Sequence, residues 1–259
     1  MEPTIRLKKS IETFLTEKVT TFGFAPVTRF ENAPEAHHPE RLCKNAETVI
    51  VFGISIPRGV LRSPDYNLHT MQRSYHTVYT RLDDIALDLC NVIETSGNAY
   101  AVPVPAYAPM AFQGVEPWGL LSLKHAAVNA GLGAIGRNGL LHHPHHGTML
   151  RFGAVVTSAS LPDSELNNEF PCPEKCGACH RACPSGAFDE KGQFSKMTCL
   201  GHTIKHAIYP IAFKDNESFK NIEQIINTAG YNYWLECNRC IAVCPNNKLK
   251  ENNNGRDQG

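Results

Sequence analysis

The sequence of 259 residues predicts an α+β fold in two parts. Three observations support this class. Helical and extended patterns alternate over residues 1–160, the composition changes after residue 158, and eight of the ten cysteines fall between Cys172 and Cys244. We therefore expect a sheet-and-helix core over residues 1–160 and a cysteine-rich module over residues 161–250. Residues 251–259 are polar and Asn-containing, which predicts a disordered tail.

Each element of the core is predicted from its own residue pattern. Apolar residues at helical spacing from Ile11 to Phe22 predict an N-terminal helix that closes at Gly23, followed by a short strand over 24–27. Residues 48–56 are apolar and β-branched almost throughout, which is typical of a central strand buried on both faces. The other expected elements are a helix from Val78 to Gly97, a strand over 99–104, a helix over 120–130, a strand over 149–157 and a helix through Phe219–Ile226.

Charge and hydropathy narrow the function classes. Lys+Arg and Asp+Glu are equal at 25 each, and the sequence pI is about 7.2, so no global positive field recruits nucleic acid. No apolar run approaches the ~20 residues of a membrane span. The N-terminus lacks the apolar segment of a secretion signal, so we expect a cytoplasmic protein without a membrane partner.

The cysteines supply the strongest motif. They form two runs, each ending in Cys-Pro, with one cysteine between them: Cys172, Cys176, Cys179 and Cys183, then Cys199, then Cys237, Cys240 and Cys244. Eight thiolates are the ligand count of two 4Fe-4S clusters, and in two-cluster ferredoxins the last cysteine of each run ligates the other cluster. This predicts a ferredoxin-like module. One cluster is assigned to Cys172, Cys176, Cys179 and Cys244, and the second to Cys183, Cys199, Cys237 and Cys240. Cys172 is separated from Cys176 by an x3 gap in place of the usual x2, so its assignment has the weakest support.

Two other uses of the cysteines fit less well. Disulfides need an oxidising compartment, which the N-terminus does not indicate. A zinc site would use four paired ligands, without the Cys-Pro ends or the interleaved eighth cysteine. Outside the runs, Cys90 lies in an apolar helical stripe and Cys43 stands alone, so packing is the preferred role for both.

A glycine motif near the end of the core could be mistaken for a dinucleotide-binding loop. Residues 131–136 match G-x-G-x-x-G, but a dinucleotide-binding loop follows a strand and opens a helix. Here the helical pattern comes first, so we reject that interpretation. A loop of this kind brings backbone close to something bulky, either another chain segment or a flat cofactor, and the residue pattern leaves both open.

The histidines leave alternatives open as well. His142, His143, His145 and His146 flank Pro144 and could bind a transition metal, although a solvated turn is preferred. His125, just before the glycine loop, is either a core or capping residue or a contact to a cofactor or substrate.

Taken together, these motifs resemble the epoxyqueuosine reductase family. The resemblance is carried by residues 124–141 (KHAAVNAGLGAIGRNGLL), the Pro144-x-x-Gly147 turn, the strand to Thr157, the double Cys-Pro module, residues 23–27 and the strand over 48–56. It implies a cobalamin-binding core akin to the nitroreductase fold and to reductive dehalogenases. The two 4Fe-4S clusters would pass electrons to the corrin cobalt. The residues implied in corrin binding are Gly131, Gly133, Gly136, Asn138, Leu140 and Leu141.

The chain departs from the tRNA-modifying members of this family. Their proton-donating Asp has no counterpart over residues 106–118, and their C-terminal helical repeats do not follow Cys244. We therefore expect a small organic substrate in place of nucleic acid, and a low-potential donor such as a ferredoxin or flavodoxin. Candidate proton donors are Tyr107, Glu116 and His125, with Tyr107 preferred because a phenol can protonate a developing anion. The alternatives are an electron-transfer or corrinoid-handling protein and an epoxyqueuosine-tRNA reductase.

Overall fold

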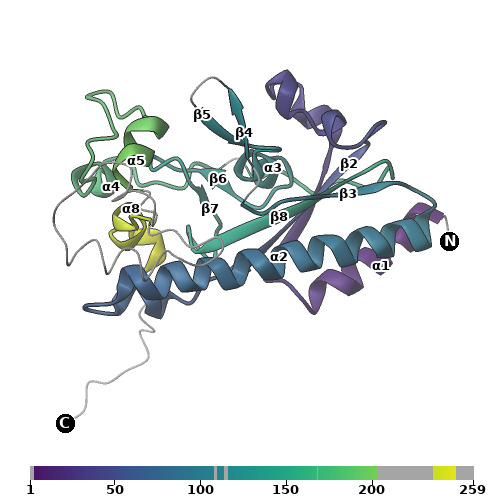
Figure 1. Ribbon diagram of the computed structural model, residues 1–259, viewed down its shortest axis with the longest axis horizontal. Helices are drawn as coiled ribbons and strands as arrows, with labels where there is room; N and C mark the ends of the chain where they lie inside the picture. Colours follow the sequence, from purple (N-terminus) through teal and green to yellow (C-terminus); the bar gives the residue numbers. More distant parts are fainter. Residues whose placement is uncertain (1–2, 108–109, 114–115, 168, 204–235, 249–259) are drawn as a thin grey trace, which may run out of the picture.

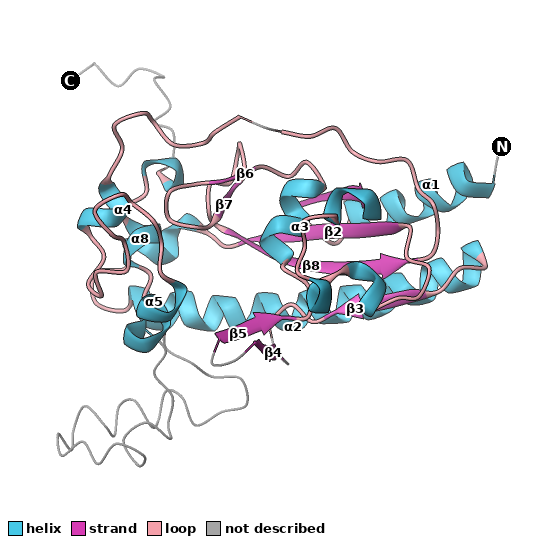
Figure 2. Cartoon of the chain, turned by 90° about the horizontal axis from the view of Figure 1, so that it is seen from above, coloured by secondary structure: helices cyan, strands magenta, loops and turns pink. Residues whose placement is uncertain are grey.

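The computed structural model describes residues 3–107, 110–113, 116–167, 169–203 and 236–248 (Figures 1 and 2). Its centre is an antiparallel sheet in the order β1-β2-β8-β3, with bounds Thr21–Pro26, Thr48–Ser55, Leu150–Thr157 and Ala101–Val104. Helices α1 (Pro3–Thr16) and α2 (Asn67–Gly97) lie on one side of the sheet, and α3 (Leu123–Asn129) lies on the other (Figure 1).

Shorter elements surround this centre. Two small antiparallel hairpins are formed by β4 (Met110–Gln113) with β5 (Glu116–Gly119) and by β6 (Ala134–Ile135) with β7 (Leu141–His142). The described part of the cysteine module contains α4 (Ala178–Arg181), α5 (Lys196–Thr203) and α8 (Arg239–Ala242). The 3-10 helices are Val27–Phe30, Glu35–His37, Pro39–Arg41, Arg58–Arg62 and Pro245–Asn247. None of the described helices is long and apolar enough to cross a membrane.

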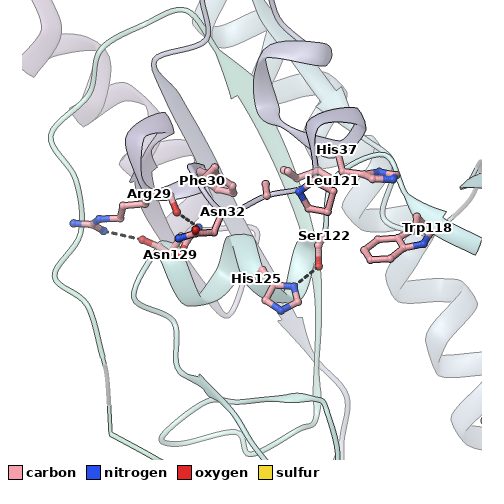
Figure 3. A pocket seen from close by; sticks show the side chains of 11 residues that line it. Arg29, Phe30, Asn32, His37, Trp118, Leu121, Ser122, His125 and Asn129 are labelled. Atoms are coloured by element: carbon pink, nitrogen blue, oxygen red, sulfur yellow. Dashed lines mark hydrogen bonds between the residues drawn. The ribbon is translucent and has the colours of Figure 1, made fainter. Parts of the chain in front are cut away.

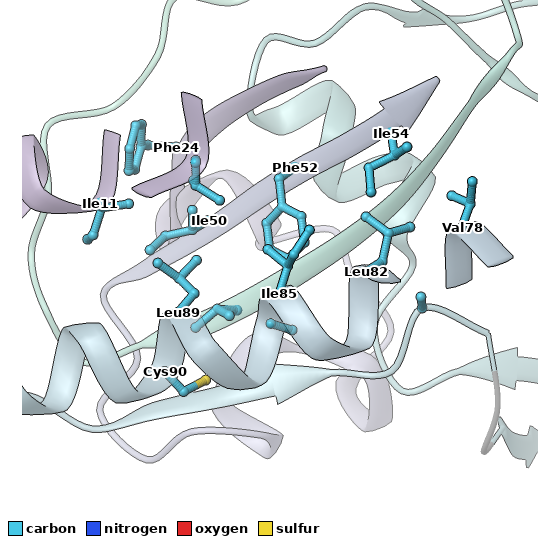
Figure 4. Packing of buried hydrophobic residues seen from close by; sticks show 14 of the residues in the cluster. Ile11, Phe24, Ile50, Phe52, Ile54, Val78, Leu82, Ile85, Leu89 and Cys90 are labelled. Atoms are coloured by element: carbon cyan, nitrogen blue, oxygen red, sulfur yellow. The ribbon is translucent and has the colours of Figure 1, made fainter. Parts of the chain in front are cut away.

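Strand β2 contributes side chains to two separate cores, because successive residues of a strand point to opposite faces. Ile50, Phe52 and Ile54 pack with the buried face of α2 (Figure 4). Val49 and Val51 pack with residues of α3 on the other side. This arrangement explains the unbroken apolar run of the sequence and confirms the expected α+β class.

Several boundaries differ from the sequence prediction. Helix α1 ends at Thr16 and not at Gly23, because residues 21–26 pair with β2 and Phe22 joins the sheet. Helix α3 covers only 123–129. The β4-β5 hairpin was not predicted, since Pro117 and Gly119 weigh against a strand in sequence. The helix expected at 219–226 and the tail expected at 251–259 lie outside the described residues.

The cysteine module packs directly on the core. Ile241 and Cys240 join the hydrophobic cluster of α2. The buried Asn247 donates from Nδ2 to Thr148 Oγ1 (2.7 Å) and accepts the Thr148 amide at Oδ1 (2.8 Å). These contacts hold the second cysteine run against the turn between β7 and β8, so the thiols face the core.

Truncation of Leu89 to alanine should cost about 2–5 kcal/mol of unfolding free energy, because its side chain is fully buried between α2 and the sheet. The matched control is Leu87→Ala, two residues away on the same helix. Leu87 is 57% exposed, and its truncation should change stability by less than about 0.5 kcal/mol. Urea unfolding of both variants measures the difference. Equal losses would contradict the packing described here.

Candidate functional site

The two cysteine runs and Cys199 approach one another in the fold. Burial raises the pKa of Cys244, and the neighbouring thiols raising it further belong to Cys172, Cys176 and Cys179. Burial also raises the pKa of Cys240 to about 12, and here the neighbouring thiols are Cys199, Cys237, Cys179 and Cys183. We call the two predicted ligand sets group A (Cys172, Cys176, Cys179, Cys244) and group B (Cys183, Cys199, Cys237, Cys240), and each set crosses the sequence order. The neighbours of Cys244 all belong to group A, whereas those of Cys240 are the other three members of group B together with Cys179 of group A.

Matching local structure explains this crossing. The short helices α4 and α8 begin within the C-x2-C segments and lie against each other. Each is closed by the same turn: the amide of Cys183 donates to His180 O, and the amide of Cys244 donates to Ile241 O, both at 3.2 Å. The following proline cannot continue a helix. Each run therefore directs its last thiol away from its other cysteines.

The donor chemistry of both groups fits iron–sulfur clusters. Each group offers four thiols, and soft thiolate ligands select zinc, copper(I) or iron–sulfur centres. Among the described residues, no three His, Cys, Asp or Glu side chains converge closely enough to hold one metal ion. A 4Fe-4S cluster needs no such convergence, because its four thiolates bind different irons. Coordination would also deprotonate thiols whose pKa burial otherwise raises.

Cys183 shows local support for a thiolate. Burial alone would raise its pKa, but hydrogen bonds from Ser185 and from the amides of Ala187, Ser185 and Gly186 lower it below the ordinary value. The Ser185 hydroxyl lies 3.3 Å from Cys183 Sγ. Donors directed at a sulfur stabilise its charged form.

The four cysteines of group B line a cavity of about 430 Å³ together with residues of the core. Its apolar wall includes Leu140, Phe188 and Phe194. Its polar wall holds Tyr107, Lys124, Arg151 and Glu236 beside the thiols of Cys183, Cys199, Cys237 and Cys240. Thiols and ionisable side chains therefore border the same space.

Hydrogen bonds and ring contacts order the polar wall. The Tyr107 hydroxyl donates to Glu236 Oε1 at 3.0 Å, and the Tyr107 ring stacks on Tyr79 with centroids 5.1 Å apart. The Arg151 guanidinium lies 3.9 Å from the centroid of the Tyr75 ring. Lys124 Nζ donates to Gly139 O at 2.6 Å.

Burial shifts Tyr107, Glu236 and Lys124 toward their neutral forms. It raises the pKa of Tyr107, and the negative charge of Glu236 raises it further. It also raises the pKa of Glu236, against the opposing effect of Arg151. Burial and then Lys196 lower the pKa of Lys124. Shifted groups that converge on a cavity indicate a site for proton transfer.

The three predicted proton donors are not brought together. Tyr107 lines the thiol cavity, whereas His125 lines a different pocket of about 360 Å³, where its Nδ1 lies 2.6 Å from Ser122 Oγ (Figure 3). Trp118 and His37 stack at the edge of that pocket, with centroids 5.2 Å apart. Glu116 lies in β5, and its side chain is outside the description. Tyr107 is thus the only predicted donor that the described residues place beside the thiols.

The glycines of residues 131–136 lie against other chain segments and do not border open space. A Cβ at Gly131 would overlap the carbonyl oxygen of Glu165, and one at Gly133 would overlap that of His142. A Cβ at Gly136 would overlap the imidazole of His142. Between the two alternatives, the structure therefore favours another chain segment at these three glycines.

The rest of this segment does face the interior of the site. Asn138, Gly139 and Leu140 line the thiol cavity. Leu140 and Leu141 line an adjacent cavity of about 240 Å³. Of the residues implied in corrin binding, Asn138, Leu140 and Leu141 border open space, whereas the three glycines do not.

Sequence reasoning missed Lys124, Arg151 and Glu236. Two of them carried a usable signal. Arg151 is the one charged residue in the apolar strand 149–157, and Glu236 directly precedes Cys237. Lys124 had none, because a lysine on a helix is usually solvated.

The histidine turn is only partly solvated. His142 is 4% exposed, which corrects the expectation of a solvated turn at this residue. Asn246 Nδ2 can only donate, so His142 Nδ1 accepts this bond (2.9 Å) and the opposite Nε2–H donates to Asn138 Oδ1 (3.0 Å). His143 lies 5.1 Å from His146 and 5.8 Å from His145 between ring centroids.

Stability should fall on acidification because of His142. Burial lowers its folded-state pKa to about 4, against an ordinary value of 6.5. Between these values the unfolded chain binds more protons than the folded chain, so the free energy of unfolding decreases as the pH drops from about 6.5 to about 4. Urea unfolding at pH 7 and pH 5 should show a smaller decrease for His142→Gln than for the wild type. An identical decrease would show that His142 does not contribute.

Known proteins resemble this chain in sequence and in fold. No protein-family model matches the chain. It is 24% identical over 231 residues to the epoxyqueuosine reductase of Lactococcus garvieae, covering 84% of this chain and 57% of that protein. It is 30% identical over 207 residues to the tetrachloroethene reductive dehalogenase of Sulfurospirillum multivorans, covering 77% of this chain and 35% of that protein. A solved epoxyqueuosine reductase with an epoxyqueuosine-modified tRNA stem loop shares the fold, with a TM-score of 0.63 and 19% identity over 95% of this chain and 66% of that one.

These relatives are reductases, and they place the chain among the oxidoreductases. The chain is related to the epoxyqueuosine reductases and, through them, to the reductive dehalogenases, which confirms the resemblance predicted from its motifs. It spans about half the length of the Lactococcus enzyme.

The expected partners were wrong. A relative of the same fold was solved with a tRNA stem loop, which overturns the prediction of a small-molecule substrate in place of nucleic acid. The error came from using net charge. A zero sum over the chain says nothing of local charge, and Lys124, Lys196 and Arg239 all line the thiol cavity.

Proposed function

We propose that this protein is an oxidoreductase of the epoxyqueuosine reductase type, acting on epoxyqueuosine in a tRNA stem loop. The observation that supports it most is the shared cavity, where group B thiols lie beside Tyr107 and Glu236. Reduction of an epoxide to an alkene consumes two electrons and two protons and releases water. A cavity that borders both redox and protic groups suits that balance.

The cofactors in this proposal are two 4Fe-4S clusters and cobalamin. Groups A and B would hold the clusters, and cobalamin would lie against Asn138, Gly139 and Leu140 in the thiol cavity. The wall of that cavity is largely apolar, with Leu140, Phe188 and Phe194 in it, which suits the apolar face of such a group. When bound, these groups supply electrons one at a time and deliver them to the substrate.

The chain's own residues would bind the substrate and handle the proton. Tyr107 is placed to donate a proton from its hydroxyl, which the chain keeps protonated by burial and by Glu236. Glu236 orients that hydroxyl through the 3.0 Å hydrogen bond. Lys196 and Arg239 would provide positive charge at the cavity for RNA phosphates.

The decisive experiment is conversion of an epoxyqueuosine-containing tRNA stem loop to the queuosine form. Protein purified without oxygen is supplied with cobalamin and a low-potential reductant, and the nucleosides are identified by mass spectrometry. The expected result is queuosine formation that depends on the protein. Absence of product with iron-loaded, cobalamin-treated protein would overturn the proposed substrate.

A further inference from the structure

Residues 136–142 reach the two cysteine runs at two points, directly at Cys172 and through Asn246 at the end of the other run. At the first, the Arg137 amide donates to Cys172 Sγ at 3.4 Å, and Arg137 Nη2 donates to Glu174 O at 2.8 Å. The same guanidinium lies 5.6 Å from the centroid of the Phe170 ring. A backbone donor and a positive side chain therefore both reach the start of the first cysteine run.

The second point lies at the end of the other run. Asn246, two residues after Cys244, donates from Nδ2 to His142 Nδ1 (2.9 Å) and to Pro171 O (3.0 Å). His142 in turn donates to Asn138, which the preceding glycine turn holds in place. One imidazole thus links the glycine loop to both ends of group A.

Two further observations describe the contact between this loop and the first cysteine run. A Cβ at Gly136 would lie 3.1 Å from Cys172 Sγ, in addition to its overlap with His142. Arg137 Nε is buried and has no hydrogen-bond partner among the described residues. A buried donor on the residue whose amide bonds Cys172 would be satisfied by an anionic group at that place.

We infer that the Gly136–His142 loop is a positioning element for the group A cluster, in which Arg137 raises the reduction potential of that cluster and Gly136 allows it to assemble. This inference rests on the proposed cluster content. Hydrogen bonds to the sulfurs and nearby positive charge favour the more negative, reduced state of a 4Fe-4S cluster. The G-x-G-x-x-G motif then serves the iron–sulfur module, because its glycines allow the loop to approach His142 and Cys172.

The test measures the potentials of both clusters in the full chain by redox titration followed by electron paramagnetic resonance. Arg137→Gln should make the midpoint potential of one cluster more negative and leave the other midpoint unchanged. The expected shift corresponds to a roughly two- to tenfold smaller equilibrium constant for reduction of that cluster. Tenfold corresponds to about 59 mV for one electron. The matched control is Lys175→Gln, which removes the same charge from an exposed position between Cys172 and Cys176. Its shift should be clearly smaller.

A second variant tests assembly without relying on potential. Gly136→Ala should retain about four iron per chain, with the signal of one cluster intact, whereas Gly59→Ala, whose Cβ meets nothing within 4 Å, should retain about eight. Equal shifts for Arg137→Gln and Lys175→Gln, or full iron and unchanged potentials in Gly136→Ala, would overturn the inference. Should Gly136→Ala fail to fold, Arg137→Gln decides. A wild-type protein without clusters would instead refute the proposed function.

Discussion

Replacing Cys176 and Cys244 together should remove no more iron than replacing either one alone. Wild-type protein reconstituted without oxygen should hold about eight iron and eight sulfide per chain, and each single serine variant about four. The two cysteines lie 68 positions apart but belong to the same group, so losing one or both affects a single cluster. Iron and sulfide analysis measures this directly.

The matched comparison uses two cysteines of the same run. Cys240 and Cys244 are four positions apart but belong to different groups, so the Cys240→Ser/Cys244→Ser double variant should lose nearly all iron. Cys43→Ser, outside both groups, should keep about eight iron. If clusters followed the runs, the outcomes of the two double variants would be exchanged. Saturation of the wild type at four iron would also refute the two-cluster prediction.

Tyr107→Phe should lower turnover of the epoxyqueuosine stem loop by about 10²- to 10⁴-fold, the usual contribution of a positioned proton donor. Phenylalanine keeps the ring that stacks on Tyr79 and removes only the hydroxyl that donates to Glu236. Iron content and RNA affinity should therefore stay at wild-type values, and the loss should appear in kcat. Single-turnover kinetics separates this step from binding.

The control is Tyr100→Phe, which removes the same atom from a side chain that is 76% exposed. Its turnover should match the wild type. Glu236→Gln should give a smaller loss than Tyr107→Phe, because glutamine can still accept the Tyr107 hydrogen bond. Unchanged turnover in Tyr107→Phe would exclude Tyr107 as the donor and direct attention to Lys124, which lines the same cavity.

Local patterns predicted much of the fold. The central strand, the helix ending at Gly97 and the last strand of the sheet were all expected from short windows of sequence, since periodicity of apolar residues is a local property. The register of the sheet was not predicted, and the predicted end of α1 was wrong. Phe22 fits a helical stripe equally well until its pairing partner Phe52 is known.

The same distinction between local and tertiary information applies to the cysteine runs and to the predicted partner. Spacing and the Cys-Pro ends predicted two groups, because covalent geometry limits which thiols in a run can converge. The environment of those groups was not predictable in this way. Net charge led to the wrong partner, since it sums over residues that the fold distributes to different surfaces.

The sequence by itself determined the α+β class and the relationship to epoxyqueuosine reductases, and it predicted eight ligands in two groups. Only the tertiary structure decided that Tyr107 meets Glu236 across 129 positions and that Cys172 meets the amide of Arg137. It also decided that the glycine loop packs on His142 and Glu165. The physical reason is that spacing within a turn is set by the local backbone, whereas contacts between distant segments depend on how helices and strands pack around a shared core.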